Sequence, residues 1–173
     1  MRQIDKELRL IDSDGCGSTA TVAVVRKEGG QNFLYVANIG DSRAVLSRNG
    51  KAERITVEDR CDNIDEQMRI KSQNGLIVMN RVGGVLAVTR AFGDHALRDS
   101  GLTAVPHVVK IPLKPFDKFF VIASDGVWDE LSDQDAVNYC KDDASAKQIS
   151  QAIVSAAIQK GSKDNVSCIV LRF

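Results

Sequence analysis

Four aspartates occupy positions from which a carboxylate could bind a cation. Asp125 and Asp129 follow an apolar, strand-like run, Asp164 precedes the last such run, and Asp41 lies in a turn between two others. Carboxylate oxygens suit hard cations such as Mg²⁺ and Mn²⁺. Two carboxylates ~4 Å apart at an effective dielectric of ~20 repel by about 4 kcal/mol, so a cation would stabilise them. Aspartates in Asp-Gly and Gly-Asp turns also commonly hydrogen-bond only the backbone, and residue type alone leaves both interpretations open.

The residues that softer metals and redox chemistry require are scarce. The chain has two histidines, His95 and His107, which we expect to be surface residues of loops. Its four cysteines form no C-x-x-C pair, so neither a zinc site nor a redox motif is indicated. We expect them to be reduced, buried thiols of an intracellular protein, cytoplasmic or nuclear; they are Cys16, Cys61, Cys140 and Cys168.

Strand signals dominate the first part of the chain that positions these residues. An amphipathic helix is predicted within residues 1–11, from the spacing of Ile4, Leu8 and Ile11. Strands are predicted at 19–25, 34–38 and 44–47, and Asn49-Gly50 after the last of them is a type I′ hairpin signal. These elements form an antiparallel meander.

Helices enter later in the sequence. A helix over 64–74 ends at Gly75, and strands at 78–82 and 85–89 flank a hairpin turn at Gly83-Gly84, followed by a loop through Pro106. Ser132 and Asp135 resemble a capping box for a helix through Cys140. The remaining elements are a buried strand at 119–123, an amphipathic helix around 149–157 that Gly161 ends, and a strand at 166–173. No βαβ alternation dominates, so the class is α+β.

Composition limits the domain count and the partners. A chain of 173 residues has the common size of one domain. Lys plus Arg and Asp plus Glu both total 23, and no basic run is present, so we expect no nucleic-acid partner. No leader-like segment and no apolar run of about 18 residues occurs, so we expect a soluble protein without a membrane partner.

Five segments in register resemble motifs of the metal-dependent protein phosphatase family, also called PPM or type 2C. They are Gly17-Ser-Thr-Ala, Ala37-Asn-Ile-Gly-Asp-Ser-Arg-Ala-Val, Leu86-Ala-Val-Thr-Arg-Ala-Phe-Gly-Asp, Ala123-Ser-Asp-Gly-Val-Trp-Asp and Gly161-Ser-Lys-Asp-Asn-Val. The resemblance implies an antiparallel β-sandwich flanked by helices. It also implies hydrolysis of phosphoserine or phosphothreonine on phosphoprotein substrates, by a hydroxide that bridges two Mn²⁺ or Mg²⁺ ions.

The resemblance assigns roles to the four aspartates. Asp125 and Asp164 correspond to ligands of one catalytic metal, and Asp41 and Asp129 to the neighbourhood of a third, weaker metal site. No residue of this chain is assigned as catalytic. Arg43 and Arg90 could bind phosphate or serve structural pairs, and Trp128 is expected to be a buried support of the metal loop rather than a substrate contact.

The chain also departs from the family pattern. An Asp-Gly-His-Gly segment and an upstream arginine, which in the family bind metal and phosphate, have no counterpart here. Asp59-Arg-Cys-Asp stands where the family has Asp-His-Lys-Pro, and Pro106-His107 where it has Pro-Glu. We therefore expect residues 1–173 to form a single partial domain that lacks its N-terminal portion.

Such a partial domain should expose apolar sheet surface or unpaired strand edges, which favours self-association or pairing with the missing segment. Three functions remain open. The chain is a phosphatase of weak or no activity alone, a non-catalytic interaction or regulatory module, or a fragmentary gene product without a role.

Overall fold

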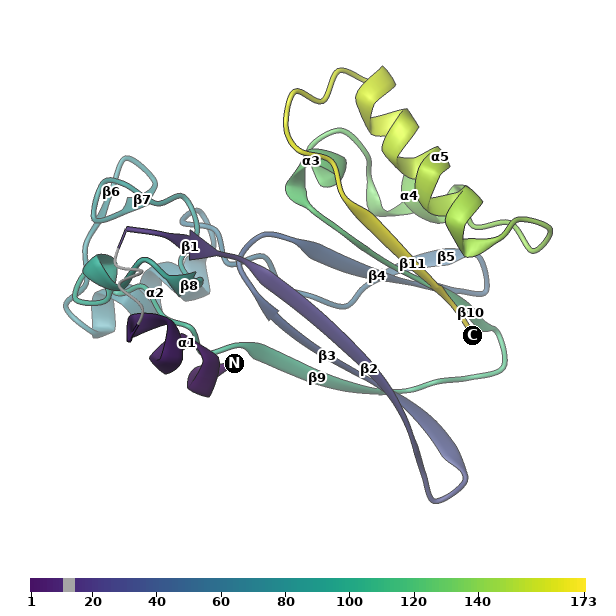
Figure 1. The fold of residues 1–173 in the computed structure, drawn as a ribbon, viewed down its shortest axis with the longest axis horizontal. Helices are drawn as coiled ribbons and strands as arrows, with labels where there is room; N and C mark the ends of the chain where they lie inside the picture. The colour runs from purple at the N-terminus through teal and green to yellow at the C-terminus, as the bar shows by residue number, and fades with distance from the viewer. Residues whose placement is uncertain (11–14) are drawn as a thin grey trace. The chain divides into compact units, whose positions relative to one another are not determined.

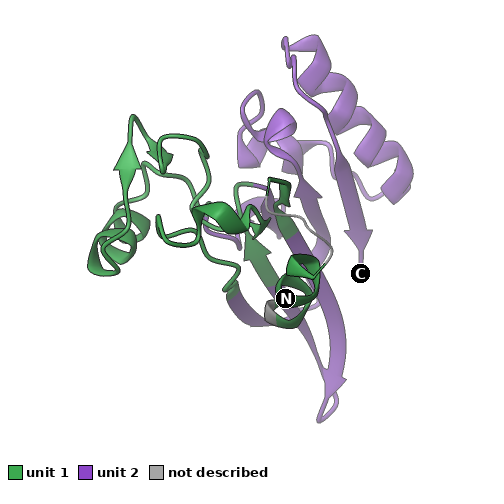
Figure 2. Cartoon of the chain, turned by 60° about the vertical axis from the view of Figure 1, so that its left-hand side comes forward, with its two compact units in different colours: residues 1–20, 37–41, 58–107 green, residues 21–36, 42–57, 108–173 purple. Residues whose placement is uncertain are grey.

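The computed structural model describes residues 1–10 and 15–173, and the chain forms two compact units (Figure 2). Unit 1 comprises residues 1–20, 37–41 and 58–107, and unit 2 comprises 21–36, 42–57 and 108–173. The prediction of a single partial domain stays a prediction. Ile11, at the end of the first predicted helix, lies outside the described residues.

Unit 2 contains a four-stranded antiparallel sheet in the order β11-β10-β4-β5 (Figure 1). Its strands are β4 (Arg43–Arg48), β5 (Lys51–Arg54), β10 (Asp117–Ala123) and β11 (Cys168–Arg172). The predicted hairpin between β4 and β5 is confirmed. Asn49 and Gly50 have φ values of 52° and 74°, as a type I′ turn requires.

Strand alternation gives this sheet two apolar faces. Phe119 and Val121 of β10 pack with helices α3 (Asp125–Trp128), α4 (Asp133–Asn138) and α5 (Ala146–Gln159). Phe120, between them, packs on the opposite side with Leu34 and Val36. Because successive side chains of a strand point to opposite faces, one strand contributes to both cores.

The second core lies against a three-stranded sheet in the order β2-β3-β9. Its strands, which lie mainly in unit 2, are β2 (Ala20–Glu28), β3 (Gln31–Ile39) and β9 (His107–Pro112). Two packed sheets with helices on an outer face match the predicted α+β sandwich, and the fold class is confirmed.

Local capping signals place the helices of unit 2. The hydroxyl group of Ser132 accepts a hydrogen bond from the Asp135 amide, while the Asp135 carboxylate accepts one from the Ser132 amide. The predicted capping box is therefore confirmed. Helix α5 has a second box, formed by Ser145 and Gln148, and so begins at Ala146, three residues before its first predicted apolar position.

Unit 1 has short elements around a separate small core that includes Ile70, Val82 and Leu102. Its elements are α1 (Arg2–Arg9), β1 (Gly17–Ser18), α2 (Ile64–Ser72), β6 (Ile77–Val78), β7 (Arg81–Val82), β8 (Phe92–Gly93) and the 3₁₀ helix η1 (His95–Leu97). Strands β1 and β8 pair antiparallel.

The hairpin predicted around Gly83-Gly84 is partly wrong. The chain already turns at Met79 and Asn80, so the strand predicted over 78–82 is split into β6 and β7. Both turn residues have positive φ, 50° and 56°, a conformation that asparagine tolerates better than most residues. The glycine pair still turns the chain, because Val82 also forms a bridge with Leu86.

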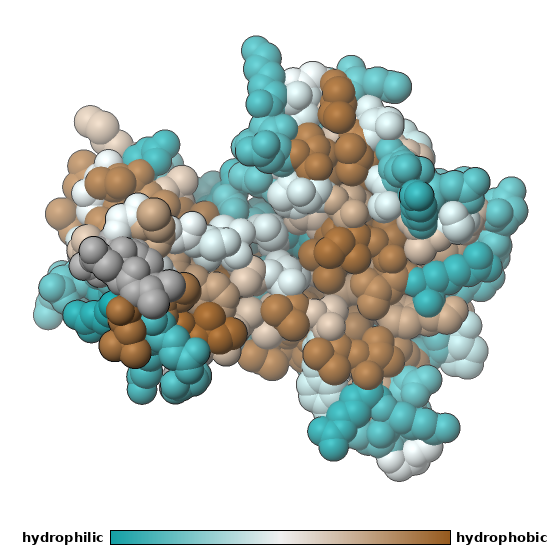
Figure 3. Space-filling view, in the orientation of Figure 1, coloured by the Kyte–Doolittle hydropathy of each residue, from teal (hydrophilic) through white to brown (hydrophobic). Residues whose placement is uncertain are grey.

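Several apolar side chains of unit 2 are exposed, as Figure 3 shows for one face of the molecule. Val22 and Val24 of β2 are 48% and 54% exposed, and Ile169 of β11 is 62% exposed.

No helix among the described residues is long and apolar enough to cross a membrane. The cysteines are free thiols, and the prediction that all are buried holds fully for Cys61 alone, since Cys140 and Cys168 are half-buried and Cys16 is exposed.

Candidate metal centre and a buried ion network

Two loops of unit 2 carry predicted metal ligands and are joined by hydrogen bonds. The Ser124 hydroxyl donates to the Asn165 carbonyl at 3.1 Å and accepts from the Ser167 amide at 3.1 Å. From the other side, the Ser162 hydroxyl donates to the Gly126 carbonyl at 2.7 Å. The segment that contains Asp125 is thereby held against the segment that contains Asp164.

The contact between these loops requires a glycine. A Cβ atom at Gly126 would lie 2.5 Å from the Asn165 carbonyl oxygen and 3.4 Å from Cβ of Asp164. Within each loop the carboxylate accepts the next backbone N–H, from Gly126 to Asp125 at 3.0 Å and from Asn165 to Asp164 at 2.6 Å. The two side chains therefore start from adjoining, well-defined turns.

Asp129 lies one helical turn beyond Asp125, and its backbone amide donates to the Asp125 carbonyl at 2.9 Å. Asp129 and Asp164 are exposed and Asp125 is half-buried. Within the described part of the chain, these three residues do not form a group whose ligand atoms all lie within 4.8 Å of one another. Their role as metal ligands stays a prediction.

Asp41 belongs to unit 1, where it follows Gly40 at the end of β3. Its Oδ2 atom lies 3.4 Å from Nε of Arg60, which occupies the position of a family histidine. A guanidinium group therefore already faces this carboxylate. The predicted metal role of Asp41 stays a prediction.

Arg43 and Trp128 support the loop that carries Asp125. The Arg43 guanidinium contacts Asp133 at 2.5 Å and lies 5.1 Å from the centre of the Trp128 ring. The indole N–H of Trp128 donates to the Ala123 carbonyl at 2.9 Å, and the residue is 6% exposed. These contacts favour the structural alternative for both residues over direct phosphate or substrate contact.

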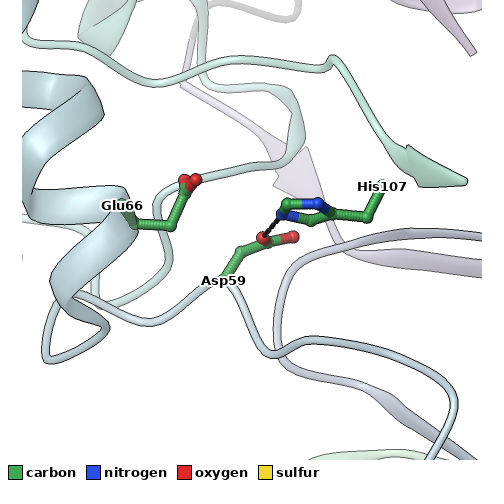
Figure 4. A group of neighbouring side chains, drawn as sticks. All are labelled: Asp59, Glu66 and His107. Atoms are coloured by element: carbon green, nitrogen blue, oxygen red, sulfur yellow. Dashed lines mark ion pairs between the residues drawn. The ribbon is translucent and has the colours of Figure 1, made fainter.

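A second cluster, which sequence reasoning did not find, lies within unit 1. Asp59, Glu66 of α2 and His107 at the start of β9 point toward one another (Figure 4), and their possible ligand atoms all lie within 4.8 Å. Asp59 is fully buried and Glu66 is 3% exposed. The expectation that both histidines lie on the surface is wrong for His95, whose side chain is 6% exposed and contacts Asp5 at 3.4 Å. The His107 side chain is 37% exposed and contacts Asp59 at 3.0 Å.

Glu66 is saturated by hydrogen-bond donors. Arg90 donates from Nη2 at 2.6 Å, Arg69 from Nη2 at 2.8 Å, and the Thr89 hydroxyl at 2.6 Å. Burial by itself would raise the pKa of this carboxyl group, but the hydrogen bonds from Arg90, Arg69 and Thr89 outweigh it and lower the pKa to about 2. Glu66 is therefore an ionised member of a buried ion network.

Asp59 is in the opposite situation. Burial raises its pKa to about 7, and the charge of Arg90 and the hydrogen bond from Gly40 offset this only in part. Burial and the Arg90 charge also lower the pKa of His107 below its ordinary value. The carboxyl group of Asp59 therefore changes protonation near pH 7.

The network does not fit a divalent cation. Arg69 and Arg90 already balance the charges of Asp59 and Glu66, with Arg90 only 3.2 Å from Asp59, so an added metal ion would bring two uncompensated positive charges. Only the spacing of Glu66 and Arg69 on one helix face was readable from the sequence. Arg90 and His107 reach the cluster through the tertiary fold.

Comparison with known proteins agrees with the fold and with the five motifs. The model of the protein phosphatase 2C family matches residues 1–166. Protein phosphatase 2C homolog 1 of Schizosaccharomyces pombe is 41% identical over 162 residues, covering 92% of this chain and 46% of the relative. The Saccharomyces cerevisiae protein of the same name is 37% identical over 183 residues, covering 97% of this chain and 64% of the relative.

Solved structures agree in fold. Serine-threonine phosphatase 2C from Toxoplasma gondii superposes with a TM-score of 0.81 at 26% identity, covering 99% of this chain and 63% of that one. A sex determining protein of C. elegans has a TM-score of 0.83 at 24% identity, covering 99% of this chain and 44% of that one, and this match concerns the fold alone.

The chain spans less than two thirds of the length of these relatives. The match nevertheless extends over nearly all of its own residues, in sequence and in structure. The chain therefore belongs to the protein phosphatase 2C family.

Proposed function

We propose that this chain is part of a metal-dependent phosphatase that hydrolyses phosphoserine and phosphothreonine on proteins. Mn²⁺ or Mg²⁺ is the cofactor, and Asp125 and Asp164 are ligands of one ion. The observation that carries the proposal is the hydrogen-bonded junction of their two loops through Ser124 and Ser162. Family membership supports it, because relatives in that family are named protein phosphatases.

The donor set suits such ions. Carboxylate oxygens on adjoining turns are hard ligands, and each carboxylate is already oriented by a backbone N–H. When bound, the ions supply a metal-activated hydroxide and offset the charge on the phosphate oxygens. The residues of this chain hold the ligand loops together, and the Arg43 guanidinium lies over the ring of Trp128, in the helix that begins at Asp125.

Asp41 and Asp129 are proposed to lie near a further, weaker ion. No Asp-Gly-His-Gly segment occurs in the 173 residues, so the resemblance provides only part of the family's ligand set. We propose accordingly that the chain alone turns over weakly or not at all.

The test is a calorimetric titration of Mn²⁺ and Mg²⁺ into the wild-type chain and the Asp125→Ala and Asp164→Ala variants. Asp143→Ala, which changes an exposed loop aspartate of unit 2, is the matched control. Binding that both variants abolish and the control retains supports the ligand assignment. Wild-type binding that survives both substitutions, or no binding at millimolar metal, overturns it.

The same samples are assayed on an aryl phosphate and on a phosphoserine peptide with Mn²⁺. Metal-dependent turnover that disappears with Asp125→Ala supports the phosphatase proposal. If the chain binds metal but hydrolyses neither substrate, the result agrees with its partial set of metal ligands. The assay is then repeated with an added segment that contains the family's Asp-Gly-His-Gly motif.

A non-catalytic interaction module is the second candidate, and the exposed valines of β2 favour it. Val22 and Val24 would be covered by self-association or by a bound segment. Light scattering across a hundredfold range of concentration tests self-association, with Val24→Lys as the variant. A wild-type monomer throughout that range contradicts self-association.

A further inference from the structure

The turn that carries Asp41 is held by a side chain that is distant in sequence. The Asp59 amide donates to the Gly40 carbonyl at 3.0 Å, and the Gly40 amide donates to Oδ2 of Asp59 at 2.9 Å. These reciprocal hydrogen bonds satisfy both backbone groups of Gly40 in a buried setting. A buried amide left without an acceptor destabilises the fold, so the pair is a strong restraint on the turn.

The turn itself has little freedom to adapt if this restraint is lost. Gly40 has a φ of +92°, and a Cβ atom there would lie 2.2 Å from Cγ2 of Thr19. The Asn38 side-chain amide also donates to the Gly40 carbonyl at 3.1 Å. One conformation is therefore selected, and the Gly40 N–H depends on Asp59 for its acceptor.

Asp59 is in turn fixed from the opposite side. Its carbonyl accepts from the Thr89 amide at 2.7 Å and from the Thr89 hydroxyl at 3.1 Å. Its Oδ1 atom faces Arg90 Nε at 3.2 Å and His107 Nε2 at 3.0 Å. The two carboxyl oxygens thus have separate tasks, because Oδ1 faces Arg90 and His107 and Oδ2 accepts from the turn.

We propose that Asp59 is a positioning residue, which acts through Gly40 to hold the Gly40–Asp41 turn, while Arg90 and His107 orient its carboxyl group. The contact between Asp59 and the turn is independent of the proposed function. The effect of this contact on a metal ion at Asp41 rests on the proposed function.

Amide hydrogen exchange measured by NMR at Gly40 tests the positioning role without metal. Asp59→Asn keeps an oxygen acceptor for the Gly40 N–H, and Asp59→Ala removes it. The matched control is Asp117→Ala in unit 2, because Asp117 is 3% exposed, pairs with Arg48 and accepts the Lys114 amide at 2.9 Å.

The expected result is that Asp59→Ala speeds exchange at Gly40 at least tenfold relative to Asp117→Ala, while Asp59→Asn stays within threefold of wild type. Equal exchange in wild type and Asp59→Ala overturns the proposal. So does an equal acceleration in both alanine variants, because that result indicates general destabilisation.

Mn²⁺ titration separates the two levels of the proposal. If Asp41→Ala weakens Mn²⁺ binding, we expect Asp59→Ala to weaken it to a similar degree. We expect Asp59→Asn to bind Mn²⁺ about as tightly as wild type. If the wild-type chain binds no Mn²⁺, the proposed function fails, and the exchange experiment still decides the positioning role.

Discussion

Oδ1 of Asp59 lies 3.0 Å from Nε2 of His107, yet neither atom makes a hydrogen bond within the described part of the chain. Burial raises the pKa of Asp59 to about 7, and burial together with the Arg90 charge lowers the pKa of His107. The two shifts have opposite signs, so they affect stability in opposite directions as pH changes.

Asp59→Asn should reduce the pH dependence of stability between pH 5 and 7. The pKa of Asp59, about 7 in the fold against an ordinary 3.8, means that the folded chain binds this proton more tightly. The stability from that proton is present at low pH and is lost as pH rises toward 7, by at most about 1.4 kcal/mol per pH unit. Urea unfolding of wild type and Asp59→Asn across pH 5–8 measures the difference.

His107→Gln is the companion variant, because the sign for histidine is opposite. A lowered histidine pKa makes stability fall as pH drops below the ordinary value of 6.5. Removing His107 should therefore leave the Asp59 effect uncompensated and steepen the loss of stability with rising pH. Identical slopes in all three proteins would contradict the role of this pair.

Glu66→Gln should be strongly destabilising at pH 7. It leaves Arg69 and Arg90 buried without their main anionic partner, which typically costs about 3–5 kcal/mol. The pKa of Glu66, lowered from 4.5 to about 2, provides stability that is present above pH 4.5 and is lost as pH falls toward 2.

The difference between wild type and Glu66→Gln should therefore shrink between pH 4.5 and 2 in the same unfolding experiment. Asp65→Asn, an exposed change on the same helix, is the control and should cost well under half as much. A loss at pH 7 no greater than that of the control would argue against the ion network.

Local signals in the sequence predicted the elements that depend on neighbouring residues. Asn49-Gly50 and the Ser132 capping box were readable because the turn and the cap involve residues at most three positions apart. The early turn at Met79 and Asn80 was not, because an isolated asparagine is a weaker signal than the glycine pair that follows it.

The candidate site was also predictable from the sequence only where local motifs identify its residues. Motifs pointed to Asp125 and Asp164, but the hydroxyl groups of Ser124 and Ser162 that join their loops act across the fold. The ion network was hidden because Arg90 belongs to a motif that also suits phosphate binding.

Gly126→Ala should separate the two loops that carry Asp125 and Asp164. The added methyl group would lie 2.5 Å from the Asn165 carbonyl oxygen, so the loops must move apart at a cost of about 1–3 kcal/mol. The melting temperature and the affinity for Mn²⁺ should both be lower than in wild type. Gly15→Ala, where an added Cβ meets no atom within 4 Å, is the control, and equal effects of the two variants would contradict close contact between the loops.

If Asp41 binds a metal ion as proposed, Arg60→Gln should strengthen that binding. The Arg60 guanidinium lies 3.4 Å from this carboxylate and is one third exposed, so it competes with an incoming cation at modest strength. Exposed ion pairs contribute about 0–1 kcal/mol, which limits the gain in Mn²⁺ affinity to roughly fivefold. Arg60→Lys keeps the charge and should stay near wild type. The double variant Asp41→Ala/Arg60→Gln should lose the gain, whereas a gain that survives without Asp41 would show that Arg60 acts on a different ligand.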